Sequence, residues 1–195
     1  MDMNVLNATF RWRPTRIYID MEALAHNLSV VKEKTNGARI MAILKANAYG
    51  HGMIPIAREL SKLGVDSFAV AFLEEGVQLR QAGIEGNILV LGGLVSYQVK
   101  HFLDYHLDLT ASSFYKAEQV SCEAKRLGRV ARVHLKIDTG LNRIGVKVAN
   151  ALDFALKVAK LPNLQLVGIF SHFVRAQGPD RSEEHTSELQ SPNTI

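Results

Sequence analysis

Three polar side chains stand at or just after apolar runs, where each could take part in chemistry. Lys45 ends the run RIMAILK and opens the string KANAYGHG, and burial of a lysine lowers its pKa so that the neutral amine can attack a carbonyl. Arg143 lies with Asp138 in KIDTGLNRIG, and a guanidinium can hold a carboxylate through two parallel hydrogen bonds. His172 ends LQLVGIFSH and titrates near neutral pH. An amino-acid substrate would need a group such as the Arg143 guanidinium to hold its carboxylate.

Each of these residues also has an ordinary structural interpretation. A lysine at the end of a strand is usually solvated, with its aliphatic stem over apolar neighbours. Asp138 could cap a turn that leaves Arg143 on a surface loop, and His172 could be a hydrogen-bonded structural histidine. The residue types alone therefore leave the function open.

Short apolar runs alternate with amphipathic stretches along the chain, which predicts βα units and a parallel sheet. We expect strands at 39–45, 66–71, 87–92, 107–111, 132–138 and 164–172. We expect helices near 53–63, 73–82, 96–105, 113–127 and 148–160, and an earlier helix with Asp20 as its N-cap.

Six parallel strands fit either a doubly wound sheet or part of an eight-stranded barrel. The GxGxxG fingerprint of dinucleotide-binding folds is absent, and polar residues gather at the carboxyl ends of the predicted strands. Both observations favour the barrel, in which catalytic groups lie at that end of the strands. Lys45, Asp138 and His172 would then lie at the barrel mouth. No linker or internal repeat interrupts the pattern, so we expect one domain.

The composition excludes several classes of protein. A chain of 195 residues with 47% hydrophobic content can bury one sizeable core. The formal charge of +4 comes from scattered basic residues, so we expect no nucleic-acid partner. No apolar stretch is long enough to span a membrane and no signal peptide is visible, so we expect a cytoplasmic protein. Cys122 is the only cysteine, which allows no internal disulfide, and we expect no metal site.

The last residues, RSEEHTSELQSPNTI, lose the rhythm of strands and helices. Residues 181–191 match, codon by codon, the translation of a common sequencing-library adapter. We therefore expect 181–195 to be a non-native tail, and exclude it from reasoning about the fold. The native sequence is expected to stop at Asp180, with 1–13 as an N-terminal extension and 14–180 as the barrel domain.

Four separated strings resemble the alanine racemase family in content and order: RPTRIYIDMEALAHN, AILKANAYGHG, KIDTGLNRIG and SHF. The resemblance runs from Pro14 to about Phe173, and KANAYGHG is its most diagnostic part. It implies a pyridoxal-phosphate-dependent homodimer, with an eight-stranded α/β barrel followed by a mostly β domain. We therefore expect an α/β fold, an incomplete parallel (β/α)8 barrel with about six strands, and no C-terminal β domain.

The resemblance also implies roles for individual residues. Lys45 would hold pyridoxal phosphate as an aldimine and, once displaced by substrate, would exchange the α-proton on one face. Tyr49 would contact the cofactor's phosphate. Arg143 would bind near the cofactor's phenolic oxygen and the substrate carboxylate, and His172 would lie beside the pyridine ring. Lys136 matches a lysine that some members carbamylate to position that arginine.

The implied reaction is interconversion of L-alanine and D-alanine by two-base proton exchange, supplying D-alanine for peptidoglycan. Family resemblance places the opposite-face tyrosine base, the arginine facing the pyridine nitrogen and much of the phosphate cup beyond Asp180. A six-stranded fragment would also expose strand edges and an apolar barrel interior. We therefore expect the 195-residue chain itself to be inactive and poorly soluble. Val174, Arg175 and Gln177 depart from the family pattern, which often ends in an aspartate here.

Three other functions stay open. One is an amino-acid racemase of the same fold with a broader substrate range. Another is a non-catalytic carrier of pyridoxal phosphate with the same barrel. The third is an unrelated barrel or sheet domain that serves in binding.

Overall fold

The computed structural model describes residues 16–174, so the predicted N-terminal extension and non-native tail lie outside the described residues. The chain divides into two compact units between Ala38 and Arg39, and each is described separately. The first contains helix α2, Met21–Lys34. Its N-cap is Asp20, as predicted, because the Asp20 carboxylate accepts hydrogen bonds from the first N–H groups of the helix.

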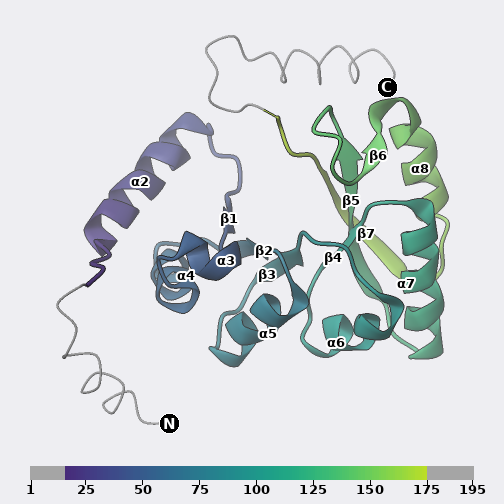
Figure 1. The fold of residues 1–195 in the computed structure, drawn as a ribbon, viewed down its shortest axis with the longest axis horizontal. Coiled ribbons are helices and arrows are strands. Elements are labelled where there is room, and N and C mark those ends of the chain that lie inside the picture. Colours follow the sequence, from purple (N-terminus) through teal and green to yellow (C-terminus); the bar gives the residue numbers. More distant parts are fainter. Residues whose placement is uncertain (1–15, 175–195) are drawn as a thin grey trace. The chain divides into compact units, whose positions relative to one another are not determined.

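The second unit is built from parallel strands (Figure 1). They are β1 (Met41–Ile43), β2 (Ser67–Val70), β3 (Asn87–Val90), β4 (Leu109–Ala111), β5 (Ala131–Asp138), β6 (Val146–Lys147) and β7 (Leu164–Phe170). β1, β2 and β3 pair in that order, and β5 pairs with β4 on one side and with β7 on the other. An isolated parallel bridge between Leu89 and Asp108 joins the sheet of β1–β3 to the sheet that contains β4, β5 and β7. All pairs among the described residues are parallel, which confirms the expected partial α/β barrel.

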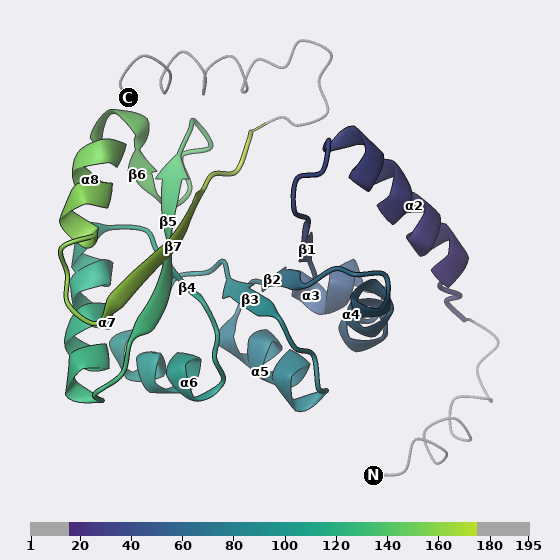
Figure 2. The same cartoon turned by 180° about the vertical axis from the view of Figure 1, so that it is seen from behind.

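Helices connect these strands (Figures 1 and 2). They are α4 (Met53–Lys62), α5 (Leu73–Gln81), α6 (Val99–Asp104), α7 (Phe114–Arg126) and α8 (Ala151–Val158), and short 3-10 turns at Ser96–Gln98 and Val148–Asn150 lead into α6 and α8. Both views show α5, α6 and α7 following one another along the outside of the strands. This arrangement is the strand–helix alternation expected from the sequence.

The core lies between these helices and the strands. β2 and β4 are buried along their whole length, because a parallel strand covered on both faces needs an apolar run rather than alternation. Phe68, Phe102 and Leu135 are among the largest fully buried side chains. On α7, Ala117, Val120 and Ala124 are completely buried. Spacings of three and four residues place them on the face that packs on the strands.

Strand β6 was not predicted. It has only two residues, and it pairs with the end of β5 at Ile137 and Asp138. The chain reaches it through Gly145, whose φ is 121°. A Cβ on Gly145 would lie 2.8 Å from the carbonyl oxygen of Lys136, so only glycine fits there without movement. The turn after β5 therefore folds back onto its own strand.

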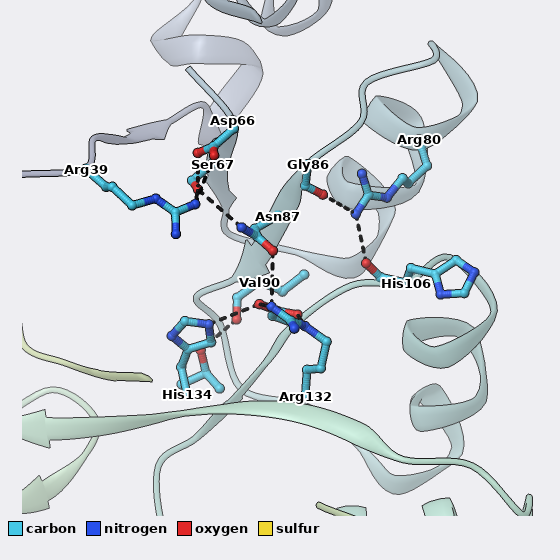
Figure 3. Close-up of polar contacts among 12 residues, drawn as sticks. Arg39, Asp66, Ser67, Arg80, Gly86, Asn87, Val90, His106, Arg132 and His134 are labelled. Atoms are coloured by element: carbon cyan, nitrogen blue, oxygen red, sulfur yellow. Dashed lines mark hydrogen bonds and ion pairs between the residues drawn. The ribbon is translucent and has the colours of Figure 1, made fainter. Parts of the chain in front are cut away.

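Arg80 on α5 ties together two turns that precede strands. Its guanidinium donates to the carbonyl oxygens of Tyr105 (3.0 Å), Ile84 (2.9 Å), Gly86 (2.8 Å) and His106 (2.8 Å). Two of these bonds are drawn in Figure 3. One side chain thus fixes both the α5–β3 and the α6–β4 connections.

We expect Arg80→Ala to lower the free energy of unfolding by about 2 kcal/mol, because four carbonyl groups lose a charged donor. Urea denaturation would measure the change. Arg58→Ala is the matched control, since Arg58 donates a single hydrogen bond, to the carbonyl oxygen of Ala82. Equal losses of stability in the two variants would contradict a special role for Arg80.

Candidate active site

Lys45 lies directly beyond β1, at the start of an unusual backbone segment, α3 (Lys45–Tyr49). Its residues 46–49 all have positive φ angles, between 52° and 55°. These are left-handed helical values, which cost a non-glycine residue roughly 1–2 kcal/mol each. The sequence predicted a loop with two glycines here. The structure has a left-handed turn, and the surrounding contacts must hold it in place.

Contacts on both sides hold this left-handed turn. The N–H of Ala46 donates to the Glu75 carboxylate at 2.7 Å. The side-chain oxygen of Asn47 accepts from the N–H of Met53 at 2.8 Å, which joins the turn to the start of α4. Ala48 is buried, with a relative exposure of 6%. The turn is therefore fixed by side chains as well as by its own backbone.

The amine of Lys45 projects from this turn toward an aromatic ring. Its Nζ lies 5.9 Å from the centre of the Tyr49 ring, within range of a cation–π interaction. Tyr49 is itself 61% exposed. The Lys45 side chain makes no hydrogen bond or ion pair within 16–174, so its amine is available to a ligand.

Lys136, near the end of β5, is buried, with a relative exposure of 3%. Its Nζ donates to the carbonyl oxygen of Ile137 at 2.9 Å and lies 5.4 Å from the centre of the Phe170 ring. Burial lowers the pKa of Lys136; the nearby Arg143 lowers it further, whereas Asp138 opposes the shift. The amine is thus easier to deprotonate than an ordinary lysine.

The turn that follows β5 presents Arg143. Asp138 caps this turn, because its carboxylate accepts from the N–H groups of Gly140 (3.2 Å) and Asn142 (2.9 Å). Asn142 adopts a left-handed φ of 54°, which asparagine tolerates. Arg143 is exposed and makes no hydrogen bond or ion pair with the described part of the chain. Its guanidinium therefore has all its donors free for a ligand.

The charges of these side chains act together on His172. Partial burial lowers the pKa of His172, and the positive charges of Arg143, Lys136 and Lys45 lower it further. Residues from two separate segments, one after β1 and one at the end of β5, therefore act on one imidazole. Thr139 and Ser171 also link the ends of β5 and β7, with their hydroxyl oxygens 2.5 Å apart. The carboxyl ends of β1, β5 and β7 thus meet, as expected of a barrel mouth.

The charge of this site favours an anion. Lys45, Lys136 and Arg143 form no ion pair within 16–174, and Asp138 is the acid whose charge acts on Lys136. A phosphate group or a carboxylate would supply the missing negative charge. A free amine beside an exposed tyrosine and an unpaired guanidinium fits a phosphate-bearing aldehyde. Pyridoxal phosphate has that chemistry, and it would supply an electron sink for a carbanion at the substrate's α-carbon.

Two cavities lie elsewhere. One of about 540 Å³ borders the turn after β5, but none of Lys45, Tyr49, Lys136, Arg143 and His172 lines it. Another, of about 250 Å³, lies at the opposite, amino-terminal ends of the strands. Its polar lining residues are Arg39, Ser67, Asn87, Asp108, Arg132 and His134.

The polar residues that line this second cavity were not predicted to form a cluster, although each of them stands near the start of a predicted strand. Figure 3 shows how its side chains converge from β2, β3 and β5. Asp108 is its centre, accepting from Arg132 Nε at 2.6 Å and lying 3.1 Å from His134 Nε2. A Cβ on Gly168 would lie 2.5 Å from the His134 ring, so Gly168 makes room for it. Groups at this end of a barrel serve stability rather than catalysis.

Comparison with known proteins decides the family. The model of the alanine racemase N-terminal domain matches residues 19–193. The chain belongs to the alanine racemase family. An alanine racemase from Geobacter sulfurreducens is 44% identical over 179 residues, which cover 91% of this chain and 47% of the relative. Another from Clostridium tetani is 39% identical, over 87% of this chain and 44% of the relative. The chain therefore spans about half the length of these relatives.

Solved structures agree with this assignment. Alanine racemase from Clostridium difficile 630 superposes with a TM-score of 0.80 at 33% identity, over 86% of this chain and 44% of that one. Histidine racemase from Leuconostoc mesenteroides superposes with a TM-score of 0.82 at 30% identity, over 90% and 48%. The resemblance drawn from the four sequence strings is thus confirmed. Within residues 16–174 no helix is long and apolar enough to span a membrane, and no group of three or more potential metal ligands occurs.

The electrostatic coupling at this racemase-family site can be measured through His172. Because positive neighbours disfavour the imidazolium form, we expect Arg143→Gln to raise the pKa of His172 toward its ordinary value. A pH titration of the histidine ring protons by NMR would measure it. Lys147→Gln removes a nearby charge that does not act on His172, so it should leave the pKa unchanged. An unchanged pKa in Arg143→Gln would show that the two groups are not neighbours.

Proposed function

We propose that residues 14–180 are the cofactor-lysine half of an alanine racemase that interconverts L-alanine and D-alanine with pyridoxal phosphate. The observation that supports this most is that Lys45, Arg143 and His172 follow the carboxyl ends of β1, β5 and β7, in a chain of this family, and that the charges of Lys45 and Arg143 both lower the pKa of His172. Each group suits its proposed role. The cluster also has the positive charge that a phosphate and a carboxylate require.

In this proposal each residue has a defined role. Lys45 would hold the cofactor through its Nζ and, once the substrate has taken its place, would move the α-proton at one face with the same amine. Tyr49 contacts the phosphate. Arg143 holds the cofactor's phenolic oxygen and the substrate carboxylate, and His172 lies beside the pyridine ring. The lowered pKa of His172 supports that placement, because a neutral imidazole avoids adding a further positive charge.

Lys136 is a supporting residue in this proposal. It is buried, and burial and the charge of Arg143 lower its pKa, so its amine loses a proton more readily than an ordinary lysine does. An unprotonated amine can add carbon dioxide and release a proton, which gives a carbamate with a negative charge. That charge would hold the Arg143 guanidinium in place. The carbamate would position Arg143 without touching the reacting atoms.

The whole activity is proposed for the complete gene product, the full reading frame that contains residues 14–180. In the complete gene product a second base acts on the opposite face of the substrate, and further strands complete the barrel. The 195-residue chain alone is proposed to be inactive. We further propose a cytoplasmic homodimer that supplies D-alanine for peptidoglycan. The native boundary at Asp180 remains a prediction.

The test is to incubate the complete gene product with L-alanine and pyridoxal phosphate, and to follow D-alanine by chiral chromatography. Equal amounts of the two enantiomers are expected at equilibrium. The same assay on histidine and other amino acids tests the second candidate, a racemase of broader range, which the likeness to a histidine racemase supports. A protein that binds the cofactor and leaves every amino acid unchanged would be a carrier instead, and would contradict the racemase proposal.

A further inference from the structure

We infer that Glu75 is the residue that positions Lys45, an inference that rests on the proposed role of Lys45 in holding the cofactor. Glu75 lies in the first turn of α5, beyond the end of β2. One carboxylate oxygen accepts from the N–H of Ala46 at 2.7 Å. The other accepts from the N–H groups of Ala71 (2.7 Å) and Phe72 (3.1 Å). The carboxylate thus bridges the β2–α5 connection and the peptide group directly after Lys45.

The bridge depends on both oxygens acting as acceptors. Three backbone N–H groups point at Glu75 from two segments, and a carboxylate can accept on each side. Glutamine has one acceptor oxygen and one donor NH2, so on one side its NH2 would face an N–H group. Aspartate is one methylene shorter and would not span the same two segments. Glutamate therefore suits this position in a way that its closest substitutes do not.

The bond to Ala46 matters because that residue begins the left-handed turn. Ala46 has a φ of 52°, and alanine prefers negative φ. Without an acceptor for its N–H, Ala46 would be free to relax toward an ordinary conformation. The Cα of Lys45 is bonded to the same peptide group, so the relaxation would reorient its side chain. Glu75 thus acts through the backbone and does not touch the reacting atoms.

The charge of Glu75 also suits its place. The amino end of a helix favours a negative charge, because its first N–H groups carry partial positive charge. Glu74 occupies the same turn of α5 with the same charge, yet its side chain makes no hydrogen bond or ion pair within 16–174. Glu74 is therefore a matched control that separates the general effect of charge from the bridge.

The experiment compares Glu75→Gln with Glu74→Gln in the complete gene product by hydrogen–deuterium exchange. In Glu75→Gln we expect amides of residues 46–52 to exchange at least about tenfold faster, while β2 and β3 keep their protection. Glu74→Gln should match the unsubstituted protein. Faster exchange only at the start of α5, with residues 46–52 unchanged, would mean that Glu75 caps the helix and does not hold the turn after Lys45. Faster exchange throughout the barrel would mean that Glu75 supports the whole fold and not this turn in particular. Either result overturns the inference.

A second measurement connects the bridge to Lys45. The protein is mixed with pyridoxal phosphate, reduced with borohydride after defined times, and the label on Lys45 is quantified by mass spectrometry. We expect Glu75→Gln to label at least about tenfold more slowly, with its circular dichroism unchanged. Equal labelling rates in the two variants would overturn the positioning role. If the unsubstituted protein is not labelled at Lys45, the proposed function fails, and the exchange data still decide whether Glu75 holds the turn.

Discussion

Replacing Lys45 by alanine in the complete gene product is expected to lower kcat for alanine racemisation by at least about 1,000-fold. The variant loses both the covalent attachment point of the cofactor and a proton-transfer group, and either function alone contributes at least two orders of magnitude in typical enzymes. Exposed strand-end lysines, by contrast, affect stability little. Steady-state kinetics with saturating pyridoxal phosphate would measure the loss.

Lys62→Ala is the control for this prediction. Lys62 is exposed at the end of α4 and pairs only with Glu59 on the same helix, at 2.9 Å. Its removal should leave kcat within a factor of two. A Lys45→Ala variant that retains a tenth or more of the activity would exclude Lys45 as the catalytic lysine.

Replacing Asp108 by asparagine is expected to lower the free energy of unfolding by about 2–3 kcal/mol. The Asp108 side chain is only 3% exposed, and it accepts from Arg132 and contacts His134. The asparagine side chain has one acceptor oxygen where the carboxylate has two, so some of these donors would lose their partner. Arg132 would also lose its counter-charge. Arg132 is 42% exposed, so water would replace part of what it loses, and the remaining cost is that of leaving buried donors without an acceptor. Urea denaturation monitored by circular dichroism would measure the change.

The same network predicts how stability depends on pH. Burial alone would raise the pKa of Asp108, but the hydrogen bonds and charges of His134 and Arg132 outweigh it and hold the pKa below its ordinary value. The stabilisation is therefore present above the unfolded-state pKa, near 4, and is lost as pH falls through the lower folded-state pKa. Asp108→Asn should lack this acid-dependent loss.

Asp153→Asn provides the comparison for both results. Asp153 pairs with Lys157 one turn along α8, and both side chains are more than half exposed. Surface pairs of this kind contribute about 0–1 kcal/mol. If Asp108→Asn and Asp153→Asn destabilise the protein equally, the polar cluster around Asp108 does not stabilise the barrel.

Most of the fold was predictable because parallel strands and their helices leave strong local signals. The runs at 66–71 and 87–92 are mostly apolar and correspond to the strands β2 and β3, which are almost entirely buried. Strand ends were less predictable: the run at 39–45 gives only a three-residue strand, because the chain enters the left-handed turn two residues later. The two-residue β6 depends on the contact at Gly145, which no periodic pattern records.

The site was predictable where chemistry and motif coincide. Lys45, Arg143 and His172 were chosen because they stand at or just after predicted strands, and the charges of Lys45 and Arg143 both act on the His172 imidazole. Glu75 was missed because its function is a contact with Ala46, 29 residues away. A glutamate soon after an apolar run is also an ordinary sign of a helix start. The left-handed turn was missed as well, because local preferences oppose it and tertiary contacts decide.

The central claim is that Lys45 is the residue that attaches pyridoxal phosphate. The most direct test is to reduce the complete gene product with borohydride in the presence of pyridoxal phosphate, digest it, and map the modified peptide by mass spectrometry. We predict about one phosphopyridoxyl group per chain, on Lys45 within AILKANAYGHG. Modification confined to other lysines, such as the buried Lys136, or no stoichiometric modification at all, would contradict the account.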